Sequence, residues 1–321
     1  MSMSDASMGQ SGRPAISQGP VPATADASRP FTRHSGSVAV KINSEVVLLL
    51  GWTRAILLQL AHPLVASGIA DHSSFNTANI ARLHHTLKAM IALTFGTPEE
   101  VKRAADNIND IHDRVHGKLR ESAGLFPAGT EYSAHDSRLL AWVHATLLDS
   151  FLDTYELYVG PLTLEVKDRY CLEASSIEPL LGISTGHLPR SLAELNRYMD
   201  EMFESGELVV TETARVVARN VVSLPVWWVI RPLLWLFNLP GIGSLPTAIR
   251  QAYGFRWDWW HQASLRFSVL LLRTLLRFVP SIFRHWPEAS RSWFAILAGI
   301  EKGQAVKWPV ILSIPRSAAG K

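Results

Sequence analysis

Helical periodicity is the feature of this sequence that most restricts its fold. From Asn43 onward, apolar residues recur at spacings of three and four along most of the chain, the pattern of one buried helix face. Runs of alternating polar and apolar residues are short, and the dipeptides Asn-Gly and Asp-Gly, which favour tight hairpins, are absent. The sequence therefore predicts an all-α fold, formed by a single large helical domain.

Local signals mark where several of these helices begin and end. The run Thr97-Pro98-Glu99-Glu100 combines a capping residue, a proline in the first turn and a capping-box glutamate, so it predicts a helix start. Apolar spacing then predicts that this helix continues through Val115 and Leu119. The other predicted helices are 46–70 with a break at Pro63, 78–95, 136–158, a segment that starts at Ser191, and weaker ones near 164–180, 211–222, 258–278 and 289–299.

The first 36 residues differ from the rest of the chain. They are rich in Ser, Gly, Ala and Pro and contain no Leu, Trp or Tyr, so they cannot bury enough apolar surface to offset the entropy of ordering. We expect a disordered tail over 1–36 and a folded domain over 37–321. The tail lacks the apolar stretch of a secretory signal, which favours a cytoplasmic protein.

Composition excludes several classes of function. Cys171 is the only cysteine, which rules out an internal disulfide, an all-thiolate metal site and a covalently attached c-type haem. The net charge is only +3 and no block of Lys or Arg occurs, so we expect no nucleic-acid partner. With 47% apolar and 18% charged residues, and eleven Trp, the chain is expected either to enclose an apolar pocket or to touch lipid.

Residues 221–246 are the most lipid-like segment. Arg231 and four prolines interrupt this segment, whereas a membrane-spanning helix needs about 20 uninterrupted apolar residues. Its tryptophans suit a membrane interface, so peripheral membrane contact is one interpretation. Burial in the core and a position in the wall of a pocket are the two others.

Polar residues on otherwise apolar helix faces are the candidate site residues. Arg54 and His62 lie eight residues apart on one face of an apolar segment, and a buried arginine requires an anionic partner. That partner is either a carboxylate of a neighbouring helix or an acidic group of a ligand. Arg82, His85 and Thr86 share a second face by their spacing.

Four histidines lie on apolar helix faces: His62, His85, His112 and His144. A single inward histidine is usually a satisfied core residue, but four make a shared site worth considering. Two chemistries could use them. His112 and His116, four residues apart, resemble a zinc pair, although Asp113 stands where the protease motif has glutamate. A b-type haem would need one axial imidazole, an apolar slot and cations for its propionates.

The order and spacing of six motifs resemble the family of latex-clearing proteins (rubber oxygenases) and mycophenolic-acid-pathway oxygenases of bacteria and fungi. The resemblance extends over about residues 40–300. The motifs are Arg54 to Pro63, Gly68 to Phe75, Arg82-x-x-His85-Thr86, Phe95 to Glu100, Ile111-His112-x-x-Val115-His116-Gly117 and Trp142-Val143-His144-Ala145-Thr146-Leu147.

This resemblance implies that 37–321 is the catalytic domain of an oxygenase that uses haem b and O₂ on an apolar, often isoprenoid, substrate. The family's proximal iron ligand corresponds to His112. The lysine that can hold the opposite axial side corresponds to His85, so bis-histidine ligation is an alternative. No residue corresponds clearly to the glutamate base of rubber cleavage, and the resemblance does not support that reaction.

The remaining candidates receive roles around that haem. Arg82 and Arg54 would neutralise the propionates or polarise bound oxygen, and Thr86 would donate a hydrogen bond nearby. His62 and His144 are further cofactor-binding candidates, and 221–246 would line the substrate entrance.

Three other functions remain open from the sequence. The first is a non-catalytic carrier of haem or lipid. The second is a metal hydrolase that uses His112, His116 and Asp113. The third is a membrane-associated interaction protein anchored through 221–246.

Overall fold

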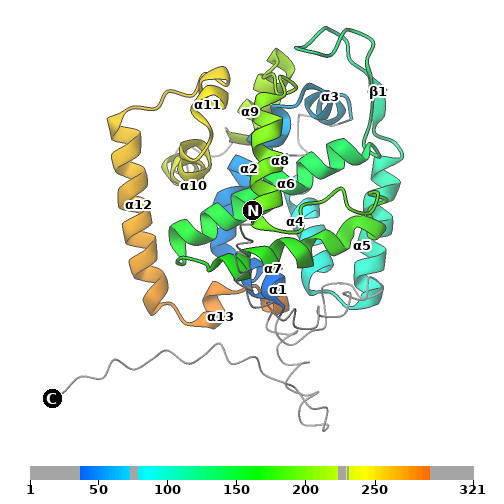
Figure 1. The fold of residues 1–321 in the computed structure, drawn as a ribbon. Helices are drawn as coiled ribbons and strands as arrows, with labels where there is room; N and C mark the ends of the chain where they lie inside the picture. The colour runs from blue at the N-terminus through cyan, green and yellow to red at the C-terminus, as the bar shows by residue number, and fades with distance from the viewer. Residues whose placement is uncertain (1–36, 73–78, 223–228, 230, 290–321) are drawn as a thin grey trace, which may run out of the picture.

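A computed structural model describes residues 37–72, 79–222, 229 and 231–289, with the side chains of 79–84 excepted (Figure 1). The tail prediction over 1–36 and most of the helix predicted near 289–299 lie outside these residues. The described elements are α1 (Val38–Asn43), η2 (Val46–Gly51), α2 (Trp52–Leu60), α3 (Pro63–Asp71), α4 (Asn79–Phe95), α5 (Pro98–His112), β1 (His116–Lys118), β2 (Glu131–Ser133), α6 (Ser137–Tyr158), α7 (Leu164–Ala174), η3 (Ser175–Leu180), α8 (Leu192–Glu204), α9 (Glu212–Val222), α10 (Arg231–Gly243), α11 (Thr247–Ala252), α12 (Trp259–Phe278) and α13 (Ser281–Arg284). The all-α prediction is confirmed.

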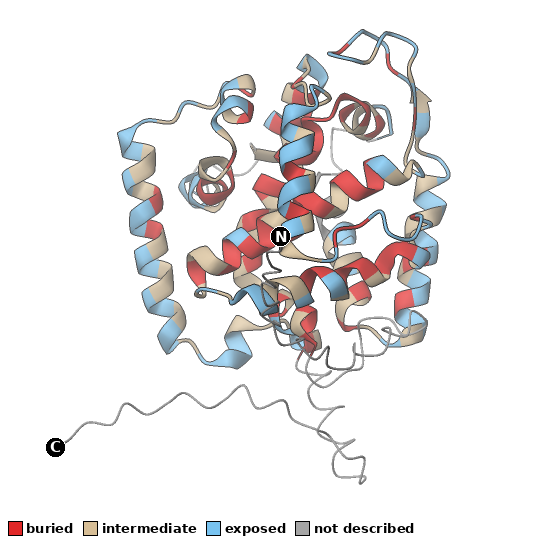
Figure 2. Cartoon of the chain, in the orientation of Figure 1, coloured by how far each residue is buried: buried red, intermediate tan, exposed pale blue. Residues whose placement is uncertain are grey.

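Helices α2 and α6 form the centre of the molecule. Asp136 caps the first turn of α6, and the helix packs against α2, η2, α7, α8 and α12. Its apolar residues are buried along most of its length, as Figure 2 shows by the red segments at the centre of the fold. Trp142 is almost completely buried in the main core cluster together with Leu57, Leu58 and Leu60 of α2. Burial of these large apolar side chains stabilises the centre of the fold.

The predicted break at Pro63 is a sharp bend between α2 and α3. The axis turns by 104° between residues 46–60 and 63–71. His62 occupies the capping position, and its Nδ1 accepts a hydrogen bond from the backbone N–H of Leu64 at 3.3 Å. Proline suits the first turn of α3 because that turn needs no donor from it.

Helices α4 and α5 form an antiparallel hairpin whose connection is the predicted capping box. Thr97 Oγ1 accepts from the N–H of Glu100, and the Glu100 carboxylate accepts from the N–H of Thr97. Leu93 of α4 is buried with Val101 and Ala105 of α5, against residues of α6 and η3. The hairpin therefore packs tightly at its closed end.

The prediction that the helix beginning after Thr97 continues through Leu119 is wrong. Helix α5 ends at His112, and the chain enters strand β1, which pairs with β2 in an antiparallel ribbon. Gly117 lies against Tyr132 so closely that a Cβ would come within 2.5 Å of the phenol oxygen. The phenol donates to Asp71 at 2.7 Å, which ties the ribbon to α3. Local spacing could not reveal this pairing because the partner strand lies about 15 residues away.

The last described quarter of the chain packs on one side of the core. Helix α10 contacts α2, η2 and α12, and its Gly241 sits so close to α2 that a Cβ would lie 2.7 Å from the backbone nitrogen of Arg54. Helix α12 runs along the edge of the molecule, outside α10, and leads into α13 (Figure 1).

Within the described ranges no single helix is long and apolar enough to cross a membrane, although the bent pair 46–60 and 63–71 passes the test of length and composition together. Residues 223–228 and 230 of the segment 221–246 lie outside the described residues. In the rest of the segment, Asn238 to Gly241 are buried, whereas Leu233, Trp235 and Leu236 are exposed.

Candidate functional site at the end of helix α5

The end of α5 carries the strongest candidate residue, His112. Its side chain is partly buried, and its ring makes an edge-to-face contact with His135, with the ring centroids 5.9 Å apart. His135 in turn lies 2.7 Å, through Nε2, from the carboxylate of Asp113. The Nδ1 atom of His112 is buried and has no hydrogen-bond partner among the described residues.

A second unpaired buried atom lies one helical turn earlier. Asn109 donates through its Nδ2 to the backbone carbonyl of Leu180 at 3.0 Å, which anchors the amide against the end of η3. Its Oδ1 is buried and has no hydrogen-bond partner in the described part of the chain. Because residues three apart share a helix face, Asn109 and His112 project from the same side of α5.

Electrostatics keep the His112 imidazole neutral. Burial lowers the pKa of His112 below its usual value, the neighbouring His135 lowers it further, and Asp113 opposes the shift. A neutral imidazole is the form that binds a metal ion. An unpaired, neutral and partly buried imidazole therefore has the chemistry of an iron ligand, and the unpaired amide oxygen of Asn109 has the chemistry of the acceptor that such ligands require on their other nitrogen.

The motif Arg82-x-x-His85-Thr86 lies on α4, at the end of the α4–α5 hairpin where α5 ends with His112. Thr86 and Leu93 lie seven residues apart on one face of α4, and Leu93 packs against the start of α5. Since the two helices are antiparallel, the Thr86 end of that face runs alongside the end of α5 that bears His112. His85 and Thr86 are exposed there. The side chain of Arg82 lies outside the described residues.

His62 does not join this group. Its Nε2 lies 3.4 Å from the carboxylate of Glu207, and its ring packs against Phe126 with the centroids 5.2 Å apart. Both ring nitrogens have partners when the ring is the Nε2–H tautomer, because Nδ1 accepts from Leu64. Burial lowers the pKa of His62, and Glu207 opposes that shift. His62 is thus a satisfied core histidine that also caps α3.

His144 is a different case from His62. Its Nε2 atom is buried and has no partner among the described residues. Burial lowers the pKa of His144 to about 4, and the nearby Glu178 only weakly opposes this. The ring is therefore neutral at pH 7. Glu178 itself already accepts from the backbone N–H groups of Gly186 and Leu188 and from Arg190.

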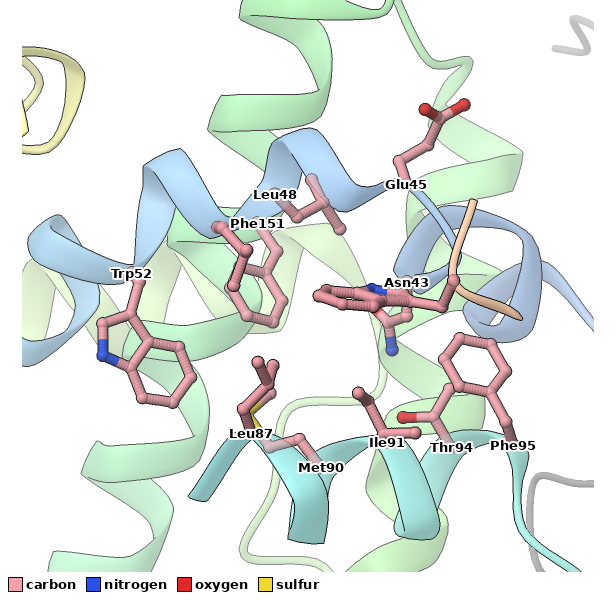
Figure 3. Close-up of a pocket in the computed structure, with 12 residues that line it drawn as sticks. Asn43, Glu45, Leu48, Trp52, Leu87, Met90, Ile91, Thr94, Phe95 and Phe151 are labelled. Carbon is pink, nitrogen blue, oxygen red and sulfur yellow. The ribbon is translucent and has the colours of Figure 1, made fainter. Parts of the chain in front are cut away.

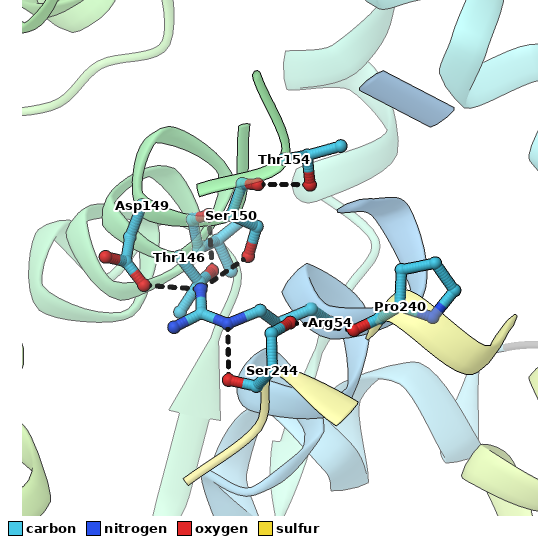
Figure 4. A network of polar contacts seen from close by, with 8 residues as sticks. Arg54, Thr146, Asp149, Ser150, Thr154, Pro240 and Ser244 are labelled. Atoms are coloured by element: carbon cyan, nitrogen blue, oxygen red, sulfur yellow. Dashed lines mark hydrogen bonds and ion pairs between the residues drawn. The ribbon is translucent and has the colours of Figure 1, made fainter. Parts of the chain in front are cut away.

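Arg54 has a partner within the protein, the carboxylate of a neighbouring helix (Figure 4). Its Nη1 donates to Asp149 and, at 3.0 Å, to Ser150 Oγ, both on α6. Its Nε donates to the backbone carbonyl of Ser244 at 3.1 Å, just after α10. The guanidinium therefore joins α2, α6 and the α10–α11 connection, and its buried charge is compensated without a ligand.

An apolar pocket lies on another face of α4 (Figure 3). The space among its side chains, including the part open to solvent, is about 400 Å³. Glu45 and Asn43 lie at its polar edge, and no described residue of 221–246 lines it. The other lining residues are Leu48, Leu49, Trp52, Leu87, Met90, Ile91, Thr94, Phe95, Phe151 and Trp286.

The zinc pair considered from the sequence does not form on one helix. His116 is exposed on β1, beyond the end of α5, so His112 and His116 do not share a helical turn. In the described ranges no group of three or more His, Cys, Asp or Glu is arranged to hold a metal ion. Cys171 is buried, and burial raises the pKa of its thiol to about 12.

Asn109 escaped the sequence reasoning because an asparagine on a helix is usually solvated. The signal that could have found it is its position on the Val101–His112 stripe, three residues before the motif histidine. Asp71 and Tyr132 were missed as a pair for another reason, since only the folded ribbon brings them together.

Comparison with known proteins assigns the family. Residues 41–278 match the family described as ER-bound oxygenase mpaB/B'/Rubber oxygenase, catalytic domain. The match covers well over half of the chain, so the protein belongs to this oxygenase family and contains its catalytic domain, which makes it an oxidoreductase by class.

Two relatives are mycobacterial. An uncharacterized protein of Mycobacterium bovis and one of Mycobacterium tuberculosis are each 27% identical over 233 residues, which are 70% of this chain and 87% of theirs. No solved structure matches this chain significantly.

Proposed function

We propose that this protein is a haem-b-dependent oxygenase that acts with O₂ on an apolar small molecule, and that His112 is the axial ligand of the iron. The observation that carries the proposal is the neutral, unpaired imidazole of His112 at the end of α5, in a chain of an oxygenase family. When bound, the haem would supply the iron centre at which O₂ is activated.

The residues around His112 would orient its imidazole ring for binding iron. Binding through Nε2 leaves Nδ1–H as a buried donor, which must find an acceptor. Asn109 Oδ1 is the unpaired acceptor on the same helix face, and its amide is already anchored to Leu180. We therefore assign Asn109 the role of a positioning residue that orients the imidazole.

Helix α4 would form the wall of the haem site that faces His112. Its Arg82, His85 and Thr86 belong to the end of the hairpin that bears His112. In this proposal Arg82 would neutralise a propionate, Thr86 would donate a hydrogen bond, and His85 would either be a second ligand to the iron or lie as a polar group near bound O₂. Arg54 and His62 have partners inside the protein, so we assign them to holding helices α2 and α3.

The apolar pocket beside α4 supports the class of substrate. Leu87, Met90 and Ile91 of α4 face Trp52 and Phe151 across it. A site lined in this way binds by apolar area rather than by charge. The apolar lining of this pocket favours a substrate such as an isoprenoid or another alkene-containing hydrocarbon.

The experiment is a titration of the purified full chain with haemin, followed by absorbance. We expect a Soret band with one haem per chain in the wild type and in His116→Ala, an exposed matched control. In His112→Ala we expect haem affinity to fall by a factor on the order of 100. Full haem retention by His112→Ala, or no Soret band in the wild type, would overturn the proposal.

Turnover is tested separately with an oxygen electrode. The loaded protein is supplied with a reductant and with squalene, an apolar isoprenoid, dispersed in mild detergent. We expect O₂ consumption that depends on squalene and that the fully saturated analogue squalane does not cause. Haem binding with equal O₂ consumption on both hydrocarbons would favour the carrier function instead.

A further inference from the structure

The outer side of α12 and α13 is an unusually apolar surface. Phe267, Leu270 and Phe278 of α12 are 66%, 67% and 79% exposed, and Ile282 and Phe283 of α13 are 70% and 75% exposed. Folded monomers rarely expose a continuous apolar patch of this kind without a partner. We name the exposed apolar residues of α12 and α13 the outer face; they are Trp259, Trp260, Phe267, Leu270, Leu271, Leu275, Phe278, Ile282 and Phe283.

The pattern of α12 shows that this exposure is organised. Trp260, Phe267, Leu271 and Phe278 recur at spacings of seven, four and seven and share one side of the helix. Leu265 and Ser268 point the other way and are buried against the body of the protein. Helix α12 therefore has two apolar sides, of which only one packs within the chain (Figure 2).

Charge identifies the partner. Arg266, Arg273 and Arg277 are spaced along one flank of the outer face, and none of them forms an ion pair within the described ranges. From Thr213 to Pro287 the chain has nine arginines and a single acidic residue, Asp258, although Arg215, Arg219 and Arg284 pair with Glu212 and Glu45 outside this stretch. An apolar stripe flanked by unpaired cations matches an anionic lipid surface, where acyl chains meet negative headgroups.

Tryptophans concentrate at one end of the same face. Trp259 and Trp260 begin α12, and Trp235 of α10 contacts His261 with the ring centroids 6.2 Å apart. Tryptophan is the residue that favours the headgroup region, because its ring is apolar and its N–H needs a polar partner.

We propose that the outer face docks α12 and α13 in the plane of an anionic membrane surface. A helix with three arginines on one flank lies in the interface rather than across the bilayer. A second copy of this chain fits less well, because an isologous contact would bring the same arginines together without an acidic partner. This proposal does not depend on haem or on turnover.

The experiment is co-sedimentation of the full chain with sucrose-loaded vesicles. We expect binding to phosphatidylcholine vesicles that contain phosphatidylglycerol, and weaker binding to phosphatidylcholine alone. The variant Phe267→Ser/Leu270→Ser/Phe278→Ser should bind at least about tenfold less. The control is Leu125→Ser/Leu164→Ser/Leu172→Ser, which removes three exposed apolar residues elsewhere and should bind like the wild type.

A second pair of variants tests the charge. Arg266→Gln/Arg273→Gln/Arg277→Gln should lose a factor on the order of 100 on anionic vesicles at about 1 kcal/mol for each arginine, and little on neutral ones. The exposed control Arg103→Gln/Arg138→Gln/Arg197→Gln removes the same charge elsewhere and should bind nearly like the wild type.

Three outcomes would overturn the proposal. The first is a wild-type chain that does not sediment with anionic vesicles. The second is a dimer by light scattering that the three apolar-to-serine changes in α12 dissociate. The third is protection of α12 from hydrogen exchange without vesicles, lost when residues 290–321 are removed by proteolysis, which would identify that segment as the occupant.

Discussion

Asn109 and His112 lie one turn apart on α5, and each holds a buried polar atom without a partner among the described residues. Two such atoms on one helix face are uncommon, because burying an unpaired polar group costs about 1–3 kcal/mol. In the function proposed above, His112 would be the iron ligand and Asn109 the acceptor for its other ring nitrogen.

This pair predicts a specific effect of Asn109. Asn109→Ala removes the acceptor, so we expect roughly tenfold weaker haem binding and a shifted Soret band in the loaded protein. Asn107→Ala, an exposed change on the same helix, should leave both unchanged. A loss of stability alone, without a spectral shift, would show that Asn109 only anchors α5 to Leu180.

His144 predicts that the protein loses stability on mild acidification. Its pKa is about 4 in the folded chain and about 6.5 when unfolded, so the unfolded state binds more protons between these values. Stability should therefore fall as the pH drops from 6.5 to 4, by up to about 3 kcal/mol from this residue. Urea unfolding across that range is the measurement. His144→Phe should flatten the slope, whereas the exposed control His187→Gln should not.

The ion pair of Arg54 and Asp149 predicts strong coupling. Arg54→Met and Asp149→Ala each leave part of a buried network unpaired, and we expect each to cost about 2–4 kcal/mol in urea unfolding. The double variant should cost less than the sum of both, with a coupling on the order of 1–3 kcal/mol. The exposed pair Lys102 and Asp106 is the control cycle, where coupling below about 0.5 kcal/mol is expected. Additive costs at Arg54 and Asp149 would contradict the bridging role.

Two helical glycines predict opposite responses to alanine. At Gly241 a Cβ would meet the backbone nitrogen of Arg54 at 2.7 Å, so Gly241→Ala must push α10 away from α2. We expect a loss of at least about 2 kcal/mol in thermal or urea unfolding. At Gly68 the nearest atoms lie at 3.4 Å or more, so Gly68→Ala should be neutral or gain up to about 1 kcal/mol from helix propensity.

Much of the fold could be predicted because its signals are local. The capping box at Thr97 and the long helix predicted over 136–158 depend on residues within a few positions of one another, and both are present at nearly the expected bounds. The bend at Pro63 is equally local, since the proline and the His62 cap suffice to stop one helix and begin the next.

The end of α5 could not be predicted for the opposite reason. Val115 and Leu119 continue the helical spacing, yet the backbone N–H of Ala134 bonds to the carbonyl of Val115, and Leu119 bonds to Thr130. Those contacts join segments about 10–20 residues apart. The packing of Tyr132 against Gly117 favours the β1–β2 ribbon over a longer helix α5. Helical periodicity does not report such contacts.

The histidines show the same limit at the site. Spacing placed His62, His85, His112 and His144 on apolar helix faces; His62 is buried, His112 and His144 are partly buried, and His85 is exposed, so the prediction is wrong for His85. Spacing does not give the position of one helix along another, so it could not separate His62, whose nitrogens both have partners, from His112 and His144, each of which has an unpaired nitrogen. Only side-chain contacts distinguish a core histidine from a free ligand.

The arginines between Thr213 and Pro287 make the distribution of charge along the chain uneven. That stretch carries a formal charge of +8 against +3 for the whole chain, so the remaining residues carry −5. The molecule is therefore an electric dipole. Near a negatively charged membrane surface such a dipole experiences a torque over about one Debye length, roughly 8 Å in physiological salt. The protein would turn its positive end toward the membrane before any atom touches the lipid. Added salt would slow this association step.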